Sequence, residues 1–465
     1  MAQRDLTQGS LVTHLIAMVG PAALGMVFST LYNVVDTFYA GWISTDAQAG
    51  LSVSFSVFMI LTSIGFGLSQ GASALIGGAI GARKADDAKA TAAQALVFAA
   101  LLGVTLAMVG VAITSTALTL LEAPPGVFDA ADSYLRLLFL GLPGFLIGFT
   151  ANGILTAQGD TKSNRNAQLA AFLANLALNP LLIYGIAGVP GLGFDGIAIS
   201  TALIQTCVAL WLTRRALATD AMSGASANDA RPTAKVIAAL TRQGAPASFA
   251  MIVMMFGMLI IQSHLQPFGA PAIAGYGIAF RVEQLILLPI LSISFSVMPM
   301  VAQNYGAEDY DRVQQAVTMA ASAALACAIA GAIVLALGGV AVTSLFTSDE
   351  ATIAAGASYL RLAALMMPAY AFMFILTALF QGLRRPIWSV VIGLYRQVAA
   401  LAVLPPLFAY RFDLGLDGIW IGLFAAVWTG LVLALVIAVV VCRRALGQFR
   451  VDFGAFRQDN TPLAP

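Results

Sequence analysis

The fold class of this chain is decided by the stretch Leu31-Tyr32-Asn33-Val34-Val35-Asp36-Thr37-Phe38-Tyr39-Ala40-Gly41-Trp42. The stretch ends an apolar run that begins near Leu11 and is long enough to cross a bilayer, because about 20 apolar residues at ~1.5 Å rise suffice. Asp36 lies inside this run, before Trp42, an aromatic residue type that settles at membrane interfaces. A carboxylate at membrane depth costs about 2.5–3.5 kcal/mol on insertion scales. Asp36 is therefore a candidate functional acid. The structural alternative is a helix-packing hydrogen bond, which an asparagine would supply at lower cost.

Composition places the whole chain in a membrane. Of its 465 residues, 60% are hydrophobic and 10% are charged, whereas soluble proteins carry about 25% charged residues. The net charge of +1 supplies no field to recruit nucleic acid. The three cysteines form no CxxC pair or metal-ligand spacing, so neither a disulfide framework nor a metal site is predicted. The first apolar run is too long for a cleavable signal and predicts a retained helix.

Hydropathy predicts about twelve transmembrane helices. Almost all basic residues fall on one side of this map, and Arg411 is the only one in an opposite-side loop. The positive-inside rule therefore predicts that both termini are cytoplasmic. The expected location of this multi-pass protein is a bacterial inner membrane. The predicted domains are a six-helix lobe over residues 1–217, a cytoplasmic linker over 218–236, a second six-helix lobe over 237–445 and a cytoplasmic tail over 446–465.

The two halves of the sequence are related by an internal repeat. A shift of 225 residues carries Pro21 onto Pro246 and Tyr134-Leu135-Arg136 onto Tyr359-Leu360-Arg361. Further along, Gln158-Gly159 matches Gln381-Gly382, and the motif at Leu192–Ile197 matches that at Leu414–Ile419. Six spans per half is an even number, so the halves share one orientation. Parallel halves with binding at their interface suit an alternating-access transporter, although channels and flippases also duplicate.

Polar residues inside neighbouring spans form a constellation with Asp36. Asn152, Asn175, Asn179 and Thr201 all fall in predicted spans of the first half, and Asn175 and Asn179 share one helix face. Pro180 frees the carbonyl of the residue one turn earlier, Leu176. These oxygens could surround a small hard cation, or they could hold a carboxyl group that is protonated in one state and ionised in another. Each asparagine alone could also serve as an interhelical hydrogen bond.

Span one with Pro21, Tyr32 and Asp36, the Asn175-x-x-x-Asn179-Pro180 run and the repeat together resemble the multidrug and toxic compound extrusion (MATE) family. The resemblance covers about Leu11 to Arg444. It implies an all-α, V-shaped transporter of twelve helices in two six-helix lobes, which exports organic, often cationic compounds in exchange for protons or sodium ions. In that family the span-one acid, here Asp36, couples ion to substrate. The positions that match its partners and the span-one hinge are Tyr32, Asn152, Asn175, Asn179, Thr201 and Pro21.

One departure from the family bears on the coupling ion. Many similar members carry a second aspartate where this chain has Asn179. A sodium ion bound at Asp36, Asn175, Asn179 and Thr201 would lack one counter-charge in a low-dielectric site, whereas a proton needs a single carboxylate. The sequence therefore favours proton coupling over sodium coupling.

Glu283 is the only other acid deep in a predicted span. It lies in Arg281-Val282-Glu283-Gln284, and because Arg281 is two residues away, the two charges point to different helix faces. Glu283, with Arg281 and Gln284 beside it, is a candidate second proton site or substrate counter-charge. The alternative is a buried network between helices. Under the repeat, Glu283 corresponds to Phe58 and Asp36 to Ile261.

Candidate substrate-contacting residues are adaptable or aromatic, because methionines repack around varied ligands and aromatic faces attract organic cations. They are Phe28, Met255, Met258, Tyr276, Phe280 and Tyr370. The expected partners are small organic cations and the lipid bilayer, with no nucleic acid and no cofactor, and a monomer is expected.

The leading hypothesis is an ion-coupled antiporter of organic cations. A lipid-linked oligosaccharide flippase shares this broad architecture, but it would need a strongly basic cavity, and Arg281 and Arg396 are the only arginines deep in spans. A membrane-embedded enzyme would need a catalytic cluster near one face, and the sequence offers neither such a cluster nor a Walker-type phosphate loop. The chain is therefore not expected to be an enzyme.

Overall fold

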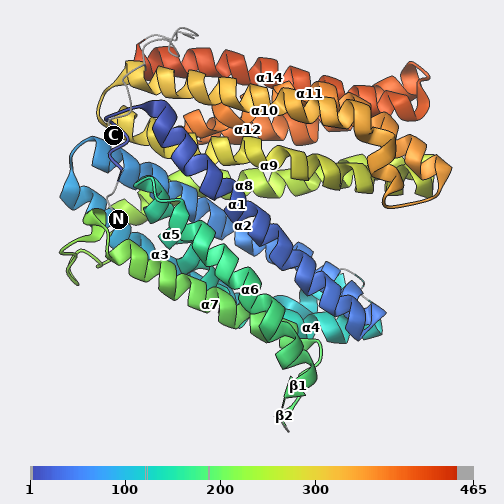
Figure 1. The fold of residues 1–465 in the computed structure, drawn as a ribbon, viewed down its shortest axis with the longest axis horizontal. Coiled ribbons are helices and arrows are strands. Elements are labelled where there is room, and N and C mark those ends of the chain that lie inside the picture. Colours follow the sequence, from blue (N-terminus) through green and yellow to red (C-terminus); the bar gives the residue numbers. More distant parts are fainter. Residues whose placement is uncertain (1–3, 121, 123, 187–188, 448–465) are drawn as a thin grey trace. The chain divides into compact units, whose positions relative to one another are not determined.

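The computed structural model describes residues 4–120, 122, 124–186 and 189–447 of the chain, and it is almost entirely helical (Figure 1). In the described part of the chain, 11 helices are long and apolar enough to cross a membrane, and a bent helix pair brings the number to 12. The prediction of an all-α membrane protein with about twelve spans is confirmed. Most of the predicted tail over 446–465 lies outside the described residues.

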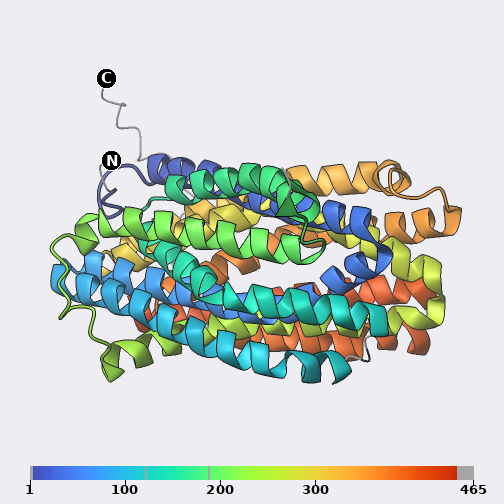
Figure 2. The same cartoon turned by 90° about the horizontal axis from the view of Figure 1, so that it is seen from below.

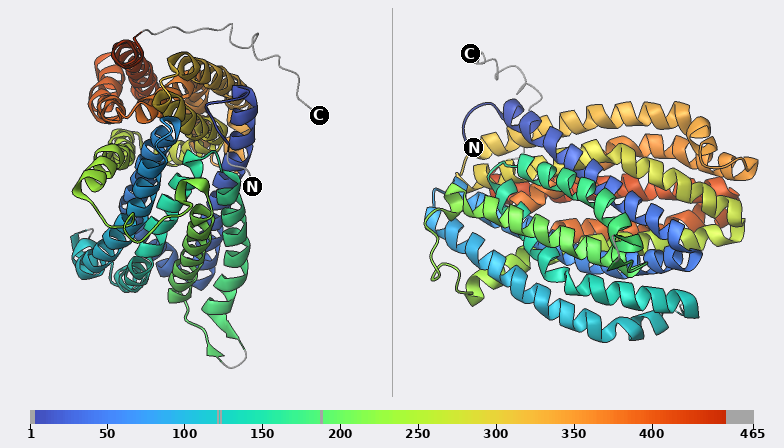
Figure 3. Two further views of the ribbon diagram at one scale, coloured as in Figure 1. Left: turned by 90° about the vertical axis from the view of Figure 1, so that its left-hand side faces the viewer. Right: turned by 60° about the horizontal axis from the view of Figure 1, so that its bottom comes forward.

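The first half contains seven helices and a short hairpin. Figure 3 shows the hairpin, β1 paired antiparallel with β2, beyond the ends of its neighbouring helices. The elements are α1 (Leu11–Ile43), α2 (Thr45–Gly81), α3 (Ala85–Leu120), α4 (Pro125–Leu140), α5 (Leu142–Ala157), α6 (Lys162–Tyr184), β1 (Gly185–Ile186), β2 (Val189–Pro190) and α7 (Asp195–Leu217).

The second half repeats this order with long helices that run alongside one another (Figure 2). Its one strongly irregular span combines short α-helical and π-helical segments between Ile387 and Arg411. The elements are η1 (Asp220–Met222), α8 (Ala234–Leu265), η2 (Gln266–Phe268), α9 (Ala270–Gly306), α10 (Tyr310–Ser344), α11 (Glu350–Gly382), α12 (Ile387–Leu394), η3 (Tyr395–Ala399), α13 (Ala400–Pro406), η4 (Leu407–Arg411) and α14 (Gly415–Leu446).

Contacts divide the chain into two compact units, and the division falls inside two helices. The first unit contains the residues up to Leu6 together with Gly20–Ser248, and the second contains Thr7–Val19 and the residues from Phe249 onward. The breaks therefore lie directly before Pro21 in α1 and shortly after Pro246 in α8, at repeat-related prolines. The predicted boundary between the two lobes, at the linker over 218–236, remains a prediction from the sequence repeat.

The predicted linker over 218–236 is packed against the first unit. Its short helix η1 buries Ala221 and Met222. Near its end, Oε1 of Gln94 in α3 accepts hydrogen bonds from the backbone N–H of Thr233 at 2.9 Å and from its hydroxyl at 2.8 Å. These contacts hold the start of α8 against α3.

The fourth predicted span, over 131–157, is broken in the structure. α4 and α5 meet at Gly141 with a bend of 50°. Pro143 lies in the first turn of α5, and a Cβ at Gly141 would approach the Cβ of Ala202 to 2.8 Å, so the bend lets α7 come close. The repeat-related Pro368 lies inside the continuous helix α11. Proline alone therefore does not decide whether a span breaks.

Side-chain contacts confirm the repeat at atomic detail. The hydroxyl of Ser133 donates to Oδ1 of Asp195 at 2.6 Å, and the hydroxyl of Ser358 donates to Oδ1 of Asp417 at 2.8 Å. These pairs occupy equivalent positions in the two halves. Both join the start of the last helix of a half to the fourth span of that half.

The structure corrects the register of one repeat match. In the turn after α5, the N–H of Asp160 donates to the carbonyl of Leu155, and in the turn after α11 the N–H of Arg385 donates to the carbonyl of Phe380. These positions differ by the original shift of 225 residues. The match of Gln158-Gly159 with Gln381-Gly382 is therefore displaced by two residues, because similar turn residues occur at different positions of the same turn.

Two prolines free repeat-related carbonyls, and a side chain from another helix approaches each carbonyl. Pro180 in α6 leaves the Leu176 carbonyl without its helical donor, and the Tyr39 hydroxyl of α1 lies 3.5 Å from that oxygen. Pro405 in α13 likewise leaves the Leu401 carbonyl without its helical donor, and Nε2 of His264 lies 3.1 Å from that oxygen. Tyr39 and His264 are themselves related by the shift of 225 residues. Each first helix of a half is thereby tied to the proline-interrupted fifth span.

His264→Phe is expected to lower the melting temperature of the detergent-solubilised protein. The variant leaves the Leu401 carbonyl without a side-chain donor, which costs about 1–3 kcal/mol when the carbonyl is buried. His264→Tyr is the matched control, because a tyrosine hydroxyl is the donor at the equivalent position in the first half. Equal melting temperatures for the two variants would contradict the role of this contact.

Candidate functional site: a buried carboxylate cluster

The first unit contains a buried carboxylate held by two amides. Asp36 of α1 is 5% exposed, and Asn175 and Asn179 of α6 are both 0% exposed. Oδ1 of Asp36 accepts a hydrogen bond from each asparagine Nδ2 at 2.8 Å. Nδ2 of Asn179 also donates to Oδ1 of Asn175 at 3.3 Å. One carboxylate oxygen is thus held by two donors from a single helix face.

The second carboxylate oxygen connects α1 to α7. The Thr201 hydroxyl donates to Oδ2 of Asp36 at 3.3 Å, and the Tyr32 hydroxyl donates to the Thr201 oxygen at 3.0 Å. Tyr32 lies one helical turn before Asp36, so it shares the face that carries the acid. The chain from Tyr32 through Thr201 to Asp36 runs entirely between buried groups.

Helix geometry explains why these side chains meet. Asn175 and Asn179 are four residues apart, so α6 presents both amides on one face. The Leu176 carbonyl that Pro180 frees was a candidate ligand of the cluster, but its hydrogen-bond partner is Tyr39. Five of the six sequence-predicted coupling residues are therefore joined by hydrogen bonds, and the freed carbonyl is not among their partners.

Asn152, the sixth predicted coupling residue, has no hydrogen bond to this cluster. It is half-buried on α5, and its Oδ1 is a buried acceptor without a partner in the described part of the chain. Phe28, a predicted substrate contact on α1, stacks on Phe172 of α6 at a centroid distance of 6.3 Å. That contact continues the α1–α6 interface in which the cluster lies.

The donors suit an anionic side chain. Asp36 receives three hydrogen bonds, and donors of this kind stabilise an ionised carboxylate. Burial opposes this effect, because it disfavours the charged form. Oδ1 of Asn179 is buried and has no partner among the described residues. The cluster therefore combines a carboxylate whose charge is subject to two opposing effects with one spare oxygen acceptor.

The repeat-equivalent positions in the second half carry no polar cluster. Asp36 corresponds to Ile261, Asn175 to Ala400 and Asn179 to Leu404. Ile261 and Ala400 are buried in the second unit. The fold thus fills this position with apolar packing in one half and with an acid in the other, so the polar residues are not needed to build the helix interface.

Glu283 lies in the second unit, on α9. It is 1% exposed, and the hydroxyl of Tyr359 on α11 donates to its Oε2. Of its predicted companions, Arg281 is exposed and Gln284 is half-buried, in keeping with the different helix faces expected. The sequence analysis did not pair Tyr359 with Glu283, although Tyr359 belongs to the Tyr-Leu-Arg match of the repeat.

The predicted substrate contacts divide by burial. Met255, Met258 and Phe280 are half-buried. Tyr276 and Tyr370 are buried at 5% and 9% exposed, so in this conformation they pack inside the second unit. Tyr276 stacks on Trp420, and Arg396 lies over the Tyr370 ring at 5.4 Å.

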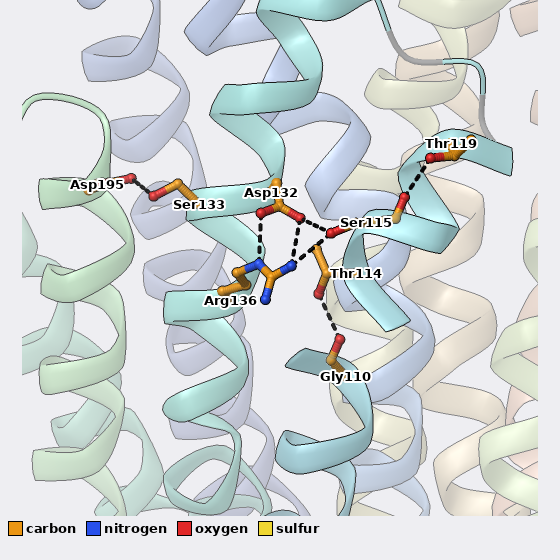
Figure 4. A network of polar contacts seen from close by, with 8 residues as sticks. All are labelled: Gly110, Thr114, Ser115, Thr119, Asp132, Ser133, Arg136 and Asp195. Atoms are coloured by element: carbon orange, nitrogen blue, oxygen red, sulfur yellow. Dashed lines mark hydrogen bonds and ion pairs between the residues drawn. The ribbon is translucent and has the colours of Figure 1, made fainter. Parts of the chain in front are cut away.

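A separate polar network lies between α3 and α4 (Figure 4). Arg136 donates through Nε to Asp132 at 2.7 Å, and Ser115 donates to the same carboxylate at 2.8 Å. In the repeat-equivalent place, Arg361 is exposed and an alanine, Ala357, corresponds to Asp132. Asp132 is partly exposed and neutralised by its arginine. This network is therefore suited to holding two helices together rather than to exchanging an ion.

A family comparison agrees with this arrangement. The sequence profile of the family described as MatE matches residues 21–181 and 246–405, which covers both halves of the repeat. The chain belongs to the MatE family. The two matched segments begin at Pro21 and Pro246, the repeat-related prolines of α1 and α8.

Full-length relatives of the family are similar across most of the chain. The probable multidrug resistance protein YoeA of Bacillus subtilis is 27% identical over 89% of this chain and 90% of its own length. The FAD transporter of Shewanella oneidensis is 28% identical over 85% and 88%. The multidrug export protein MepA of Staphylococcus aureus is 25% identical over 86% and 87%. The prediction of a MATE transporter is confirmed, and the chain is not an enzyme.

Solved structures of MATE proteins share the fold. A crystal structure of MATE in complex with MaL6 superposes with a TM-score of 0.88 at 23% identity, and the match covers 95% of this chain and 99% of that one. An outward-facing multidrug resistance MATE transporter gives a TM-score of 0.88 at 23% identity over 96% and 99%. At these identities the similarity establishes the fold of this MatE chain.

Proposed function

We propose that this MatE-family protein is a proton-driven antiporter that exports organic cations, with Asp36 as the residue that couples proton to substrate. The observation that carries the proposal is a single buried carboxylate held by three hydrogen-bond donors of α6 and α7. An acid that is not needed for packing and lies at membrane depth is expected to have a transport role. The relatives named for multidrug resistance and multidrug export support the export of drug-like compounds.

Proton uptake at Asp36 reverses a chain of hydroxyl groups. In the ionised state the Tyr32 hydroxyl donates to Thr201, and the Thr201 hydroxyl donates to Oδ2 of Asp36. When Oδ2 takes a proton it becomes a donor, so Thr201 must turn its own proton away and accept instead. Thr201 then donates toward the Tyr32 oxygen. The contact between α1 and α7 therefore depends on the charge of Asp36, which biases the helices between two arrangements.

The same charge change controls the affinity for a cationic substrate. With the pathway open to the outside, protonation removes the negative charge of Asp36 and weakens the attraction for a bound cation, which leaves. With the pathway open to the cytoplasm, loss of the proton restores the charge and the attraction. One proton enters for each export step at this site, in a protein with cytoplasmic termini in the inner membrane.

Sodium coupling is the second candidate, and Oδ1 of Asn179 favours it. This oxygen is buried without a partner in the described residues, and it belongs to the cluster that holds Asp36. Oxygen atoms are the ligands that hard cations require. Two observations oppose sodium coupling. The nitrogens of Asn175 and Asn179, rather than their oxygens, face the carboxylate, and the cluster offers a sodium ion one carboxylate instead of two.

An anionic substrate is the third candidate, and Arg281 favours it. This arginine is exposed in the first half of α9, and the FAD transporter is one of the similar relatives. Competition between ethidium and FAD for export, measured for the unmodified protein and for Arg281→Gln, separates the two substrate classes. Loss of FAD export alone in the variant would assign the anion to Arg281.

Ion gradients imposed on proteoliposomes test the proposal. Ethidium efflux is expected to follow an inward proton gradient in sodium-free buffer, and to show no response to an inward sodium gradient at equal pH on both sides. Efflux that follows the sodium gradient and not the proton gradient would show that sodium, and not the proton, is the coupling ion. Liposomes without protein provide the baseline for passive dye leakage.

A further inference from the structure

Glu283 is bonded to one member of an aromatic cluster that joins three helices of the second unit. Tyr276 of α9 packs edge-on against Tyr359 of α11 at 5.1 Å between ring centroids, and Tyr359 lies 5.2 Å from the Trp420 ring of α14. Glu283, Tyr359 and Trp420 are each only 1% exposed. In this conformation the Glu283 side chain is buried from solvent.

The carboxyl group is only half satisfied. Tyr359 donates to Oε2, but Oε1 is buried and has no hydrogen-bond partner in the described part of the chain. The Trp420 ring nitrogen is a buried donor that also lacks a partner there. A buried ionised oxygen without a donor carries its full desolvation cost. The arrangement therefore accommodates a neutral carboxyl group more easily than a permanently ionised one.

The charged and titratable groups that face Glu283 do not fix it in one state. Tyr276 lies on its own helix, and Tyr359 and Tyr370 face it from α11. Arg396 of η3 interacts with it electrostatically but forms no ion pair within 4.0 Å in the described residues. α10 carries charged side chains only in its first turn. On α14, Asp417 is bonded to Ser358.

The internal repeat shows that the fold does not need an acid at this place. Glu283 corresponds to Phe58, Tyr359 to Tyr134 and Tyr370 to Phe145. Phe58 packs edge-on against Phe145 at 4.8 Å in the apolar core of the first unit. A phenylalanine therefore fills the position in one half, whereas the other half bears the cost of a buried carboxyl group.

From this geometry we propose that Glu283 is a second proton-binding site, which takes up and releases one proton per transport cycle separately from Asp36. The step is simple protonation: the carboxylate oxygen gains a proton from water when the second unit admits solvent, and it returns the proton to water later in the cycle. The inference rests on the proposed proton antiport for its role in transport. Proton binding at Glu283 itself does not depend on that role.

Infrared difference spectroscopy tests proton binding without transport. Spectra of the purified protein in sodium-free buffer are compared between about pH 6 and 9, where exposed carboxyl groups stay ionised because their pKa is about 4. A carboxylic C=O band is expected to disappear at the higher pH. Glu283→Gln should lack this band, and Asp36→Asn should retain it. Identical pH difference spectra for the unmodified protein and Glu283→Gln would overturn the proposal.

Proton stoichiometry tests the role in transport. The proton gradient that balances an opposing ethidium gradient in proteoliposomes is expected to report two protons per dye for the unmodified protein and one for Glu283→Gln. Glu308→Gln is the matched control, because it makes the same change at an exposed residue just beyond α9. An unchanged stoichiometry in Glu283→Gln would overturn the transport role. A Glu283 band that titrates in a protein driven by sodium would instead overturn the proposed proton antiport and leave the binding site standing.

A second variant covers the case in which Glu283→Gln does not fold. Tyr359→Phe keeps the carboxyl group and removes only its hydroxyl donor. The Glu283 band is expected to remain and its midpoint pH to move, because the donor interacts differently with the two protonation states. An unmoved midpoint would overturn the assignment of the band to this pair.

Discussion

Asp36→Asn is expected to lower the rate of proton-driven ethidium efflux at least about tenfold relative to the unmodified protein, while the protein remains folded. The asparagine oxygen can still accept from Asn175 and Asn179, which are 2.8 Å from the native carboxylate. Its nitrogen can donate to Thr201, so every buried group keeps a partner and unfolding free energy should change by no more than about 1 kcal/mol. What the variant loses is the ability to change charge.

The measurement is dye efflux from proteoliposomes under an inward proton gradient, with the melting temperature measured on the same preparations. Asp132→Asn is the matched control, because it makes the same substitution in the same unit at an acid paired with Arg136. The control is expected to keep coupled efflux. Full proton-driven efflux by Asp36→Asn would remove Asp36 from the coupling mechanism and, with it, the hydroxyl chain through Thr201 and Tyr32.

Sequence reasoning succeeded where local helix geometry decides the outcome. The four-residue spacing of Asn175 and Asn179 placed both amides on one face, and the depth of Asp36 in its span required a polar interior. Tyr32 lies one turn before Asp36 on the same helix face, and Thr201 lies on a span that the family resemblance brings to Asp36. The structure joins all of these residues by hydrogen bonds.

The remaining features depend on packing between helices, which periodicity does not encode. Asn152 lies on a span that bends at Gly141, and that bend arises where α7 approaches. Tyr359 reaches Glu283 across two helices that are far apart in the sequence. The sequence shows that Pro180 frees the Leu176 carbonyl. It does not show that Tyr39 bonds this carbonyl, because that contact depends on how α1 packs against α6.

Comparison of the halves adds information that neither half contains alone. Among the residues that the structure describes, each half carries one buried acid. The equivalent position of each acid in the other half is apolar: Ile261 for Asp36 and Phe58 for Glu283. The helix scaffold therefore tolerates both polar and apolar packing at the two places. A residue that the scaffold does not require, and that costs free energy to bury, is best explained by function.

Asn179→Asp is expected to make transport respond to sodium. Nδ2 of Asn179 lies 2.8 Å from Oδ1 of Asp36, so the variant would bring two carboxylate oxygens to about that separation. Two unit charges at this distance repel by about 6 kcal/mol at an effective dielectric constant of 20. Both groups cannot be ionised together unless a cation lies between them. A sodium ion there would also gain the Asn175 oxygen as a ligand, since Asn175 adjoins both residues.

At equal pH on both sides, an inward sodium gradient is expected to raise ethidium efflux by Asn179→Asp at least about tenfold above its sodium-free rate, because the two carboxylates ionise together only with a cation between them. The unmodified protein is expected not to respond. Asn166→Asp is the matched control, since it adds the same charge at an exposed position of α6. If Asn179→Asp stayed insensitive to sodium while gaining a second titrating carboxyl band, the pair would share a proton instead, and the choice of coupling ion would not depend on the number of carboxylates in this cluster.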